Sequence, residues 1–490
     1  MPLTAANAGS ASSAEKIDGA VTSRGSSIWL WAAIAIGAVL RLIDLGHKSF
    51  WLDEIASVAI ARRSAAMFWH FLWHDEGNMA AYYVVLQPWL HLGCDEGSVR
   101  LLSVIAGVLC IPLAYWLARK ILGSETAVVA AGFFALNTCA ISVSQEARAY
   151  SFLLLLVLLS TLLFVQLVER PSYGRAVLYT LVAALTFYFH YFGVLVPAAH
   201  AVSLMALPSD RRRRLKPLLL AAALLVVAAV PILWMIHSQD VGHIAWVGGP
   251  TWLELYHLGG FLAADSGKLA GAVLLVLDLV LVGIFLAGLR TAPRESGVRW
   301  RYSLLASLLL TPIALTLLAS ILRPAFYHRF LIVCLPAWVL MTAAGAQQVR
   351  RRGWRLATIA AVCALSLLST VLLYRRASED WRGAVQYLVQ NTQPGDRVLY
   401  YESVGEFAGE SYRDWLPGQT GARPLAVAVD PATAEWQQFG DAPHVWLVLY
   451  RTKTNDVEVR RIEQKLSVSY QRAGEASFTG ISVIEFERQR

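Results

Sequence analysis

Long apolar runs separated by short polar segments extend from residue 28 to residue 374, and most runs are close to the length that crosses a bilayer as a helix. The pattern predicts a polytopic α-helical membrane protein with about eleven transmembrane helices. The predicted spans are residues 28–45, 99–118, 124–142, 150–168, 175–190, 192–207, 215–236, 268–289, 302–322, 329–349 and 354–374. The first run is short enough for a signal-peptide core, but no small-x-small cleavage site follows it, which favours an uncleaved span.

Composition supports the same class of protein. Of 490 residues, 57% are hydrophobic and only 16% are charged, which excludes a soluble globular chain and a disordered one. The formal net charge is +8, but the basic residues lie between apolar runs, where membrane topology explains them, so we expect no nucleic-acid partner. The five cysteines form no CxxC or Cys/His zinc spacing.

The basic residues also predict an orientation. Every second segment between spans carries a basic cluster, such as Arg119–Lys120 or Arg350 to Arg352, and the opposite segments carry few. The positive-inside rule therefore predicts a cytoplasmic N-terminus. An odd number of spans places the C-terminal region outside the cytoplasm, on the side of the first loop. The expected location is a membrane that borders the cytoplasm, which the chain crosses several times.

Three regions flank or interrupt the predicted transmembrane domain, residues 28–376. Residues 1–27 are rich in Ser, Ala and Gly and are expected to be a disordered cytoplasmic tail. The first external loop, 46–98, contains two aromatic stretches that predict interfacial helices, 65–73 and 79–92. Residues 377–490 hold 12 Lys and Arg against 16 Asp and Glu and predict a small extracytoplasmic α/β domain. In that domain we expect a helix at 380–390 and strands at 398–401, 445–450 and 481–486.

The chain has no nucleotide-binding, nucleophile-elbow or metalloprotease motif, so its candidate chemistry rests on polar residues beside the spans. Asp53 and Glu54 are adjacent carboxylates directly after the first span. One of them can act as a general base while its neighbour positions a partner. The alternative is that the pair forms the acidic N-terminus of an interfacial helix beginning near Ile55.

A second set of polar residues lies at the outer ends of later spans. Arg148, His190, His328 and Arg329 could together meet a phosphate at the depth of the lipid headgroups, where arginine makes bidentate contacts. The alternative is that Arg148 pairs with Glu146 and the other cations merely extend to the membrane interface.

A metal pair is a further alternative in the first external loop. His70 and His74 are four residues apart and precede two carboxylates, which is compatible with a divalent metal. Trp69 and Trp73 beside them favour an ordinary interfacial helix instead. No cofactor is certain, and a divalent metal stays open.

Several short motifs, taken in order, resemble a known family. They are Leu40-Arg41, Trp51-Leu-Asp53-Glu54, Ser144-Gln-Glu146-Ala-Arg148-Ala-Tyr150, His190-Tyr-Phe-Gly193, Tyr327-His-Arg329-Phe with Pro336, and Glu379-Asp380-Trp381-Arg382. Together, over roughly residues 28 to 390, they resemble bacterial polyprenyl-phosphate-dependent glycosyltransferases. This family has the C-type (GT-C) membrane fold and belongs to the superfamily of the protein O-mannosyltransferases and the aminoarabinose transferase of lipid A.

The resemblance implies that a sugar moves from a polyprenyl phosphate to an acceptor hydroxyl outside the cytoplasm, with inversion at the anomeric carbon. Asp53 would activate the acceptor and Glu54 would support it. Donor phosphate binding would fall to Arg148, His190, Arg329 and His328. Substrate binding would fall to Glu146, Tyr150, Tyr191, Tyr327, Asn78 and Tyr82.

The acceptor is less determined than the donor. The segment Asn78 to Tyr83 departs from the His-Pro-Pro-Leu-Tyr pattern of relatives, so the acceptor could be lipid A, another envelope glycan, a lipid or a protein. A transporter or flippase for a lipid-linked or anionic substrate is the main alternative function. Such proteins place ionisable groups at mid-membrane, whereas here only Asp278 interrupts the centre of a span. A non-catalytic scaffold would leave Asp53 and Glu54 without a role.

Overall fold

The structure, a computed structural model, describes residues 27–208, 216–238, 247–265, 269–291, 297–401, 403–415, 425–429, 442–451 and 456–489. The expected disordered tail, apart from Ser27, and the basic run Arg211 to Arg214 lie outside the described residues. The chain forms two compact units. The helical unit holds the residues up to 43 together with 65–85 and 100–375, and the mixed unit holds 44–64, 86–99 and 376–490.

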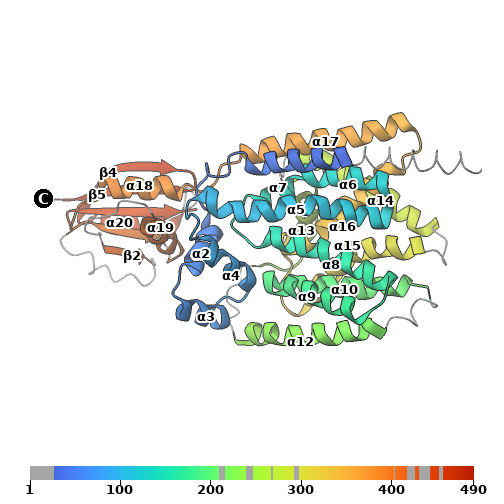
Figure 1. Cartoon of the computed structure of the whole chain (residues 1–490). Coiled ribbons are helices and arrows are strands. Elements are labelled where there is room, and N and C mark those ends of the chain that lie inside the picture. Colours follow the sequence, from blue (N-terminus) through green and yellow to red (C-terminus); the bar gives the residue numbers. More distant parts are fainter. Residues whose placement is uncertain are drawn as a thin grey trace, which may run out of the picture. The chain divides into compact units, whose positions relative to one another are not determined.

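The long helices of the helical unit run side by side (Figure 1). Among the described residues, seven helices are long and apolar enough to cross a membrane, or eight if the bent pair α6–α7 is one span. The seven are α5 (Glu96–Leu122), α8 (Tyr150–Glu169), α12 (Lys216–Ser238), α14 (Leu269–Thr291), α15 (Gly297–Leu322), the pair η4–α16 (His328–Cys334 and Leu335–Gln347) and α17 (Arg352–Tyr374). The bent pair consists of α6 (Ser124–Leu136) and α7 (Thr138–Ser144).

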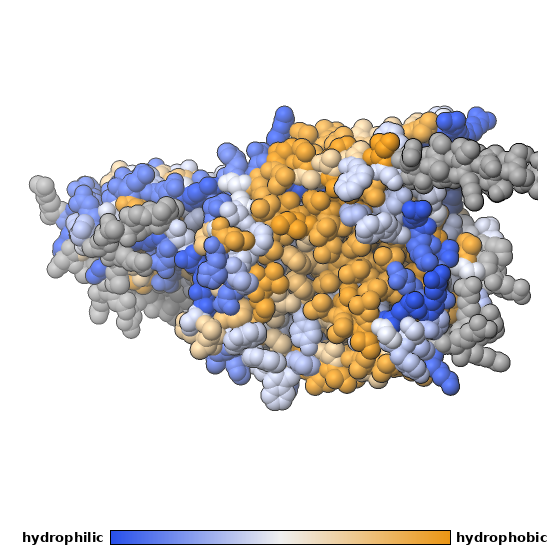
Figure 2. Space-filling model, in the orientation of Figure 1, coloured by the Kyte–Doolittle hydropathy of each residue, from blue (hydrophilic) through white to orange (hydrophobic). Residues whose placement is uncertain are grey.

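Three shorter apolar segments complete the set: the helix Ser27–Leu42, α9 (Tyr173–Phe189) and the run from η1 (Tyr191–Val194) through α10 (Leu195–Ser203) to η2 (Leu204–Ala206). Each of the eleven predicted spans coincides with one of these helices or with the bent pair. Figure 2 shows the apolar side chains gathered as a broad band over the helical unit, as expected of a surface that faces lipid. The prediction of a polytopic α-helical membrane protein is therefore confirmed.

A buried arginine stabilises the bend between α6 and α7. The two helices meet at 53°, which removes helical partners from the last carbonyls of α6. Arg41 is fully buried and donates to the carbonyls of Ala135 (3.1 Å) and Phe134 (3.4 Å) and to the Ser144 hydroxyl (3.2 Å). In a membrane interior these groups have no water to bond, so Arg41 satisfies what the bend exposes.

The remaining helices of the helical unit are short. They are α3 (Ala65–His74) and α13 (Trp252–Ala263), and α4 (Ala80–Trp89) begins in the same unit. The first and last of these agree with the helices predicted in the first external loop. On α3, Met67, Trp69 and Trp73 are exposed, as suits a helix in the membrane interface.

The mixed unit is built on a five-stranded sheet with the strand order β2-β1-β3-β5-β4. Strand β1 pairs in parallel with β2 and β3, whereas β5 pairs antiparallel with β3 and β4. The strands are β1 (Arg397–Tyr401), β2 (Leu425–Val429), β3 (His444–Tyr450), β4 (Tyr470–Phe478) and β5 (Ile481–Arg488). The helices are α2 (Leu52–Ala61), α18 (Trp381–Asn391), α19 (Ser403–Trp415) and α20 (Val457–Leu466).

The sequence predicted three of these strands and α18, and it missed β2, β4, α19 and α20. One face of the sheet carries Leu399, Leu447 and Ile484, which lie in one apolar cluster with Ile462 of α20. The exposed surface of this unit is mostly hydrophilic (Figure 2). Helix α2, from the predicted first external loop, packs against α19, so this unit joins distant parts of the chain.

Candidate active site

The predicted site residues fall into two groups, one in each unit. Asp53 and Glu54 belong to the mixed unit, and all the other predicted site residues belong to the helical unit.

The adjacent carboxylates lie in the first turn of α2, which begins three residues earlier than Ile55. Glu54 is fully buried, and its Oε2 accepts the backbone N–H of Trp51 (3.2 Å). Asp53 is partly exposed. Burial first, and then the charges of neighbouring carboxylates including Asp53, raise the pKa of the Tyr450 hydroxyl. Glu54 thus bonds to the start of its own helix, and Asp53 is the more accessible of the two carboxylates.

A buried carboxylate of the C-terminal domain fixes the start of α2. Oε2 of Glu379 accepts the backbone N–H of Leu52 (3.2 Å) and the indole N–H of Trp381 (3.2 Å). Its Oε1 accepts the Tyr450 hydroxyl (2.8 Å) and the Arg451 guanidinium. Since Leu52 directly precedes Asp53, Glu379 holds the backbone that carries the candidate base.

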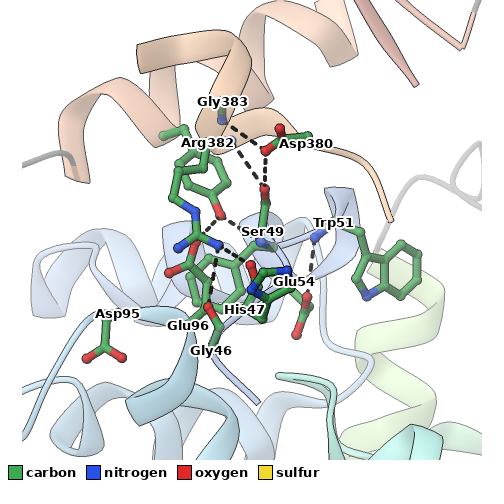
Figure 3. Close-up of polar contacts among 12 residues, drawn as sticks. Gly46, His47, Ser49, Trp51, Glu54, Asp95, Glu96, Asp380, Arg382 and Gly383 are labelled. Atoms are coloured by element: carbon green, nitrogen blue, oxygen red, sulfur yellow. Dashed lines mark hydrogen bonds and ion pairs between the residues drawn. The ribbon is translucent and has the colours of Figure 1, made fainter. Parts of the chain in front are cut away.

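Asp380 and Arg382, the residues on either side of Trp381, bind the loop that precedes α2 (Figure 3). Asp380 Oδ1 caps α18 by accepting the Gly383 N–H (2.9 Å) and also accepts the Ser49 hydroxyl (2.9 Å). Arg382 donates to the carbonyl of His47 (2.7 Å). Three side chains of the motif Glu379-Asp380-Trp381-Arg382, all except Trp381, thus bind the segment before Asp53.

A second set of contacts holds the same loop from the other side. The Tyr412 hydroxyl accepts the backbone N–H of Phe50 (2.6 Å) and donates to Glu96 Oε1 (2.7 Å). The same Glu96 oxygen lies 3.4 Å from Nε of Arg382. Phe50 is almost completely buried, and its ring packs against the Tyr412 ring at a centroid distance of 6.1 Å. Asp53 therefore stands on a segment that is bonded on both sides.

In the helical unit, Arg329 is the centre of a packed polar group. Its guanidinium pairs with the Glu146 carboxylate and lies 5.2 Å from the centroid of the Tyr150 ring. The Tyr150 ring in turn lies 5.8 Å from that of His190. Residues from η4, the α7–α8 connection and the α9–η1 turn, far apart in the sequence, are thus brought together.

The fully buried His190 lies at the turn between α9 and η1. Its Nδ1 accepts the backbone N–H of Phe192 (3.2 Å), which places the proton of the neutral ring on Nε2. Among the described residues, Nε2 has no hydrogen-bond partner. The turn itself depends on Gly193, where a Cβ would come within 2.2 Å of the Thr186 carbonyl oxygen. Arg148 is close enough to His190 for its charge to act on the ring.

The other predicted substrate-binding residues surround this group. The Asn78 side chain accepts the backbone N–H of Tyr191 (3.2 Å), which ties the start of the α4 region to the His190 turn. Tyr82 is fully buried, and its ring lies 6.2 Å from that of Phe152. Tyr327 packs edge-on against Phe330 at 5.2 Å. Asn78 and Tyr191 are thus bonded to each other, through the Asn78 side-chain oxygen and the Tyr191 backbone N–H.

His328 has a different neighbourhood from the other predicted cations. Its Nδ1 lies 3.4 Å from Glu254 Oε2, and Nδ1 of His257 lies 3.6 Å from Glu254 Oε1. These three side chains are the one group of three or more metal-ligand types found in the described part of the chain. The rings of His70 and His74 lie 4.6 Å apart, but no third ligand type joins them among the described residues.

Sequence reasoning missed several of these contributors. Glu379 and Arg382 were noticed only as parts of a motif, and Ser49, Glu96 and Tyr412 not at all. Their contacts join residues more than 300 positions apart, for which a single sequence carries no signal. Glu254 and His257, at helical i,i+3 spacing, offered a detectable signal.

Part of this chain matches a family of known proteins. Residues 78–235 match the family described as dolichyl-phosphate-mannose-protein mannosyltransferase. A search of curated proteins finds no match.

Solved structures match over nearly the whole chain. ArnT from Cupriavidus metallidurans, in a crystal structure bound to undecaprenyl phosphate, has a TM-score of 0.62 and 15% identity and covers 93% of this chain and 98% of its own. The oligosaccharyltransferase AglB from Archaeoglobus fulgidus, in complex with an inhibitory peptide and a dolichol-phosphate, has a TM-score of 0.57 and 12% identity. That match covers 95% of this chain and 74% of AglB. A further structure of the Archaeoglobus oligosaccharyltransferase, in complex with Zn and sulfate, has a TM-score of 0.53 and 13% identity and covers 94% and 73%.

The family match covers part of the chain, and the solved structures share its fold at low sequence identity. This chain is a multi-pass membrane protein with the fold of the ArnT and AglB structures.

Proposed function

We propose that this protein is a glycosyltransferase that moves a sugar from a polyprenyl-phosphate carrier to an acceptor hydroxyl on the extracytoplasmic side of the membrane. The observation that carries the proposal is the packed group of Arg329, Glu146, Tyr150 and His190 in a chain with the fold of ArnT. The ArnT structure is bound to undecaprenyl phosphate, the leaving group that such a reaction releases.

The packed group suits a phosphate leaving group. Arg329 supplies a fixed cation whose orientation is set by Glu146 and by the Tyr150 face. The Nε2–H of His190 is a buried donor without a partner among the described residues, and a buried donor without an acceptor costs about 1–3 kcal/mol. A phosphate oxygen would satisfy it. Preorganised donors of this kind stabilise the negative charge that develops as the glycosidic bond breaks.

Asp53 serves as the general base in this proposal. Its carboxylate takes the proton of the acceptor hydroxyl, the acceptor oxygen bonds to the anomeric carbon, and the carbon–oxygen bond to the lipid phosphate breaks. A single in-line displacement inverts the anomeric carbon. Glu54, Glu379 and Asp380 position the segment that carries Asp53 and do not themselves react.

The basic clusters between spans support a cytoplasmic N-terminus and extracytoplasmic chemistry in a bacterial inner membrane. No sugar nucleotide is available there, so the activated sugar arrives on a lipid. The acceptor belongs to the envelope and is lipid A, another glycan, a lipid or a protein. The sugar is a hexose or a pentose.

The test uses the full chain in lipid nanodiscs with a polyprenyl-phosphate sugar donor and an envelope extract as acceptor. Asp53→Asn should lower the turnover number about 10²–10⁴-fold, the usual contribution of a general base, and leave the affinity for undecaprenyl phosphate unchanged. Asp75→Asn is the matched control, because Asp75 is an exposed carboxylate of the same external loop.

Two outcomes would contradict the proposal. Unchanged turnover in Asp53→Asn would remove Asp53 as the base. Movement of the intact lipid-linked sugar across the membrane by the parent protein, without glycosyl transfer, would identify a transporter instead.

A further inference from the structure

Three side chains beside the Arg329 group have the composition of a metal site. Glu254 and His257 lie one turn apart on α13, and His328 begins η4, which packs against α13. Their ligand atoms all lie within 4.8 Å of one another. From this geometry we propose that Glu254, His257 and His328 form a zinc site that joins α13 to the segment carrying Arg329.

The distances fit a single metal ion between the three groups. Zn–N and Zn–O bonds of about 2.0–2.1 Å at tetrahedral angles place neighbouring ligand atoms about 3.4 Å apart. Glu254 Oε2 lies 3.4 Å from Nδ1 of His328, and Glu254 Oε1 lies 3.6 Å from Nδ1 of His257. Each imidazole thus already points its Nδ1 at the Glu254 carboxylate. Only small side-chain shifts are needed for the three groups to enclose an ion.

The ligand set selects the kind of metal. Two imidazole nitrogens and one carboxylate suit Zn²⁺, whereas Mg²⁺ and Ca²⁺ prefer oxygen ligands alone. With three protein ligands, a tetrahedral ion keeps a fourth position for water or another oxygen.

The surroundings hold the ligands in place. The side chains of His328 and Glu254 are 22% and 28% exposed, and that of His257 is 42% exposed, so the site is half-enclosed and open on one side. The ring of Phe261 packs edge-on against His328 at 5.5 Å. Thr251 caps α13 by accepting the backbone N–H of Glu254 (3.3 Å), which fixes the first turn that bears the carboxylate.

A metal bound at this site would affect Arg329, the neighbouring positively charged side chain. Arg329 directly follows His328, and its guanidinium pairs with Glu146 and lies over Tyr150. A metal that ties His328 to α13 restricts the backbone on which Arg329 stands. This consequence rests on the proposed function of Arg329 in holding the donor phosphate, whereas the metal site does not.

The first experiment measures metal binding in the absence of donor and acceptor. The tag-free full chain in nanodiscs is stripped with a chelator, titrated with Zn²⁺, washed and analysed by mass spectrometry of metals. About one tightly bound Zn²⁺ per chain is expected. His257→Ala and Glu254→Gln should each lower the affinity at least tenfold, and both variants can be checked for folding by size-exclusion chromatography and thermal unfolding. His237→Ala and His74→Ala are matched controls, since both remove an exposed histidine outside the site.

Several results would overturn the inference. These are the absence of stoichiometric Zn²⁺ in the parent chain, retention of zinc by folded His257→Ala and Glu254→Gln, and loss of zinc in His74→Ala instead. In the first of these cases the three side chains form carboxylate–imidazole hydrogen bonds only.

The second experiment measures the affinity for undecaprenyl phosphate with and without Zn²⁺. Zinc should raise this affinity in the parent chain and have no effect in His257→Ala. Zinc bound at one ion per chain without glycosyl transfer would leave the metal site standing and refute the proposed function, so the two failures are distinguishable. An affinity that is equal with and without zinc in the parent chain would refute the coupling to Arg329.

Discussion

Glu379 offers the sharpest test of how the C-terminal domain positions the candidate base. Its carboxylate accepts the Leu52 N–H, one residue before Asp53, and the indole N–H of Trp381, which is fully buried. Glu379→Ala leaves both donors without their acceptor. Hydrogen bonds to charged groups contribute about 1.5–3 kcal/mol each, and water can replace part of the bond at the half-buried Leu52. We expect a loss of about 2–4 kcal/mol of local stability.

Glu379→Gln is the matched conservative variant. Its amide oxygen can still accept from Leu52 and Trp381, while its amide nitrogen can donate to the Tyr450 hydroxyl. Only the ion pair with Arg451 is lost, and the Arg451 side chain is 60% exposed. Exposed pairs contribute about 0–1 kcal/mol, so this variant and Arg451→Ala should both stay close to the parent.

The assay combines kinetics with hydrogen exchange. A misplacement of about 1 Å can cost about 10²-fold in rate, so Glu379→Ala should lower the turnover number by about one to two orders of magnitude with little change in donor affinity. Peptides covering residues 50–55 should exchange faster in the same variant, because the start of α2 is released. Parent-like turnover in Glu379→Ala, together with unchanged exchange at these residues, would refute the positioning argument.

Three further variants test other parts of the structure. Arg41→Met should lower the midpoint of thermal unfolding, since each carbonyl of the α6–α7 bend that is left without a donor costs about 1–3 kcal/mol. A midpoint equal to that of the parent protein would mean that the bend needs no arginine. Arg329→Lys should weaken undecaprenyl phosphate binding about tenfold, because lysine lacks the planar fork that stacks on Tyr150, and equal affinity would contradict this role. A hydrogen bond from the Ser98 hydroxyl lowers the pKa of Asp95, so the ionised carboxylate stabilises the fold above its ordinary pKa of about 4, and this contribution disappears as the pH falls through the lowered value. Ser98→Ala should flatten the dependence of the thermal midpoint on pH in that acid range, and an unaltered profile would count against the bond.

The sequence was informative wherever a property repeats along the chain. Apolar runs of near bilayer length predicted the described helices of the helical unit that could cross a membrane, because a backbone buried in lipid must satisfy its own hydrogen bonds, as a helix does. Strands β1, β3 and β5 were predicted because their residues are mostly buried and apolar. Strand β4 was missed because its exposed edge carries polar residues such as Gln471 and Glu475 and so lacks that pattern.

The candidate site was predicted only as a set of residue types. The sequence singled out Asp53, Arg329 and His190 because charged and polar groups beside apolar spans are costly and therefore conspicuous. One interpretation paired Glu146 with its neighbour Arg148, but no sequence pattern indicated that the fold also pairs Glu146 with Arg329, 183 residues away. It offered His70 and His74 as the metal pair, whereas the three-ligand group is Glu254, His257 and His328.

The sequence by itself determined that this chain lies in a membrane, which segments form its long apolar helices, and which charged residues are out of the ordinary, because each of these depends on local hydrophobicity. Only the tertiary structure decided which side chains meet. Hydrogen bonds and ion pairs act over about 3–4 Å, so their partners are chosen by how helices pack and not by distance along the chain. The bonds from Glu379 to Leu52 and from Arg329 to Glu146 exist for that reason.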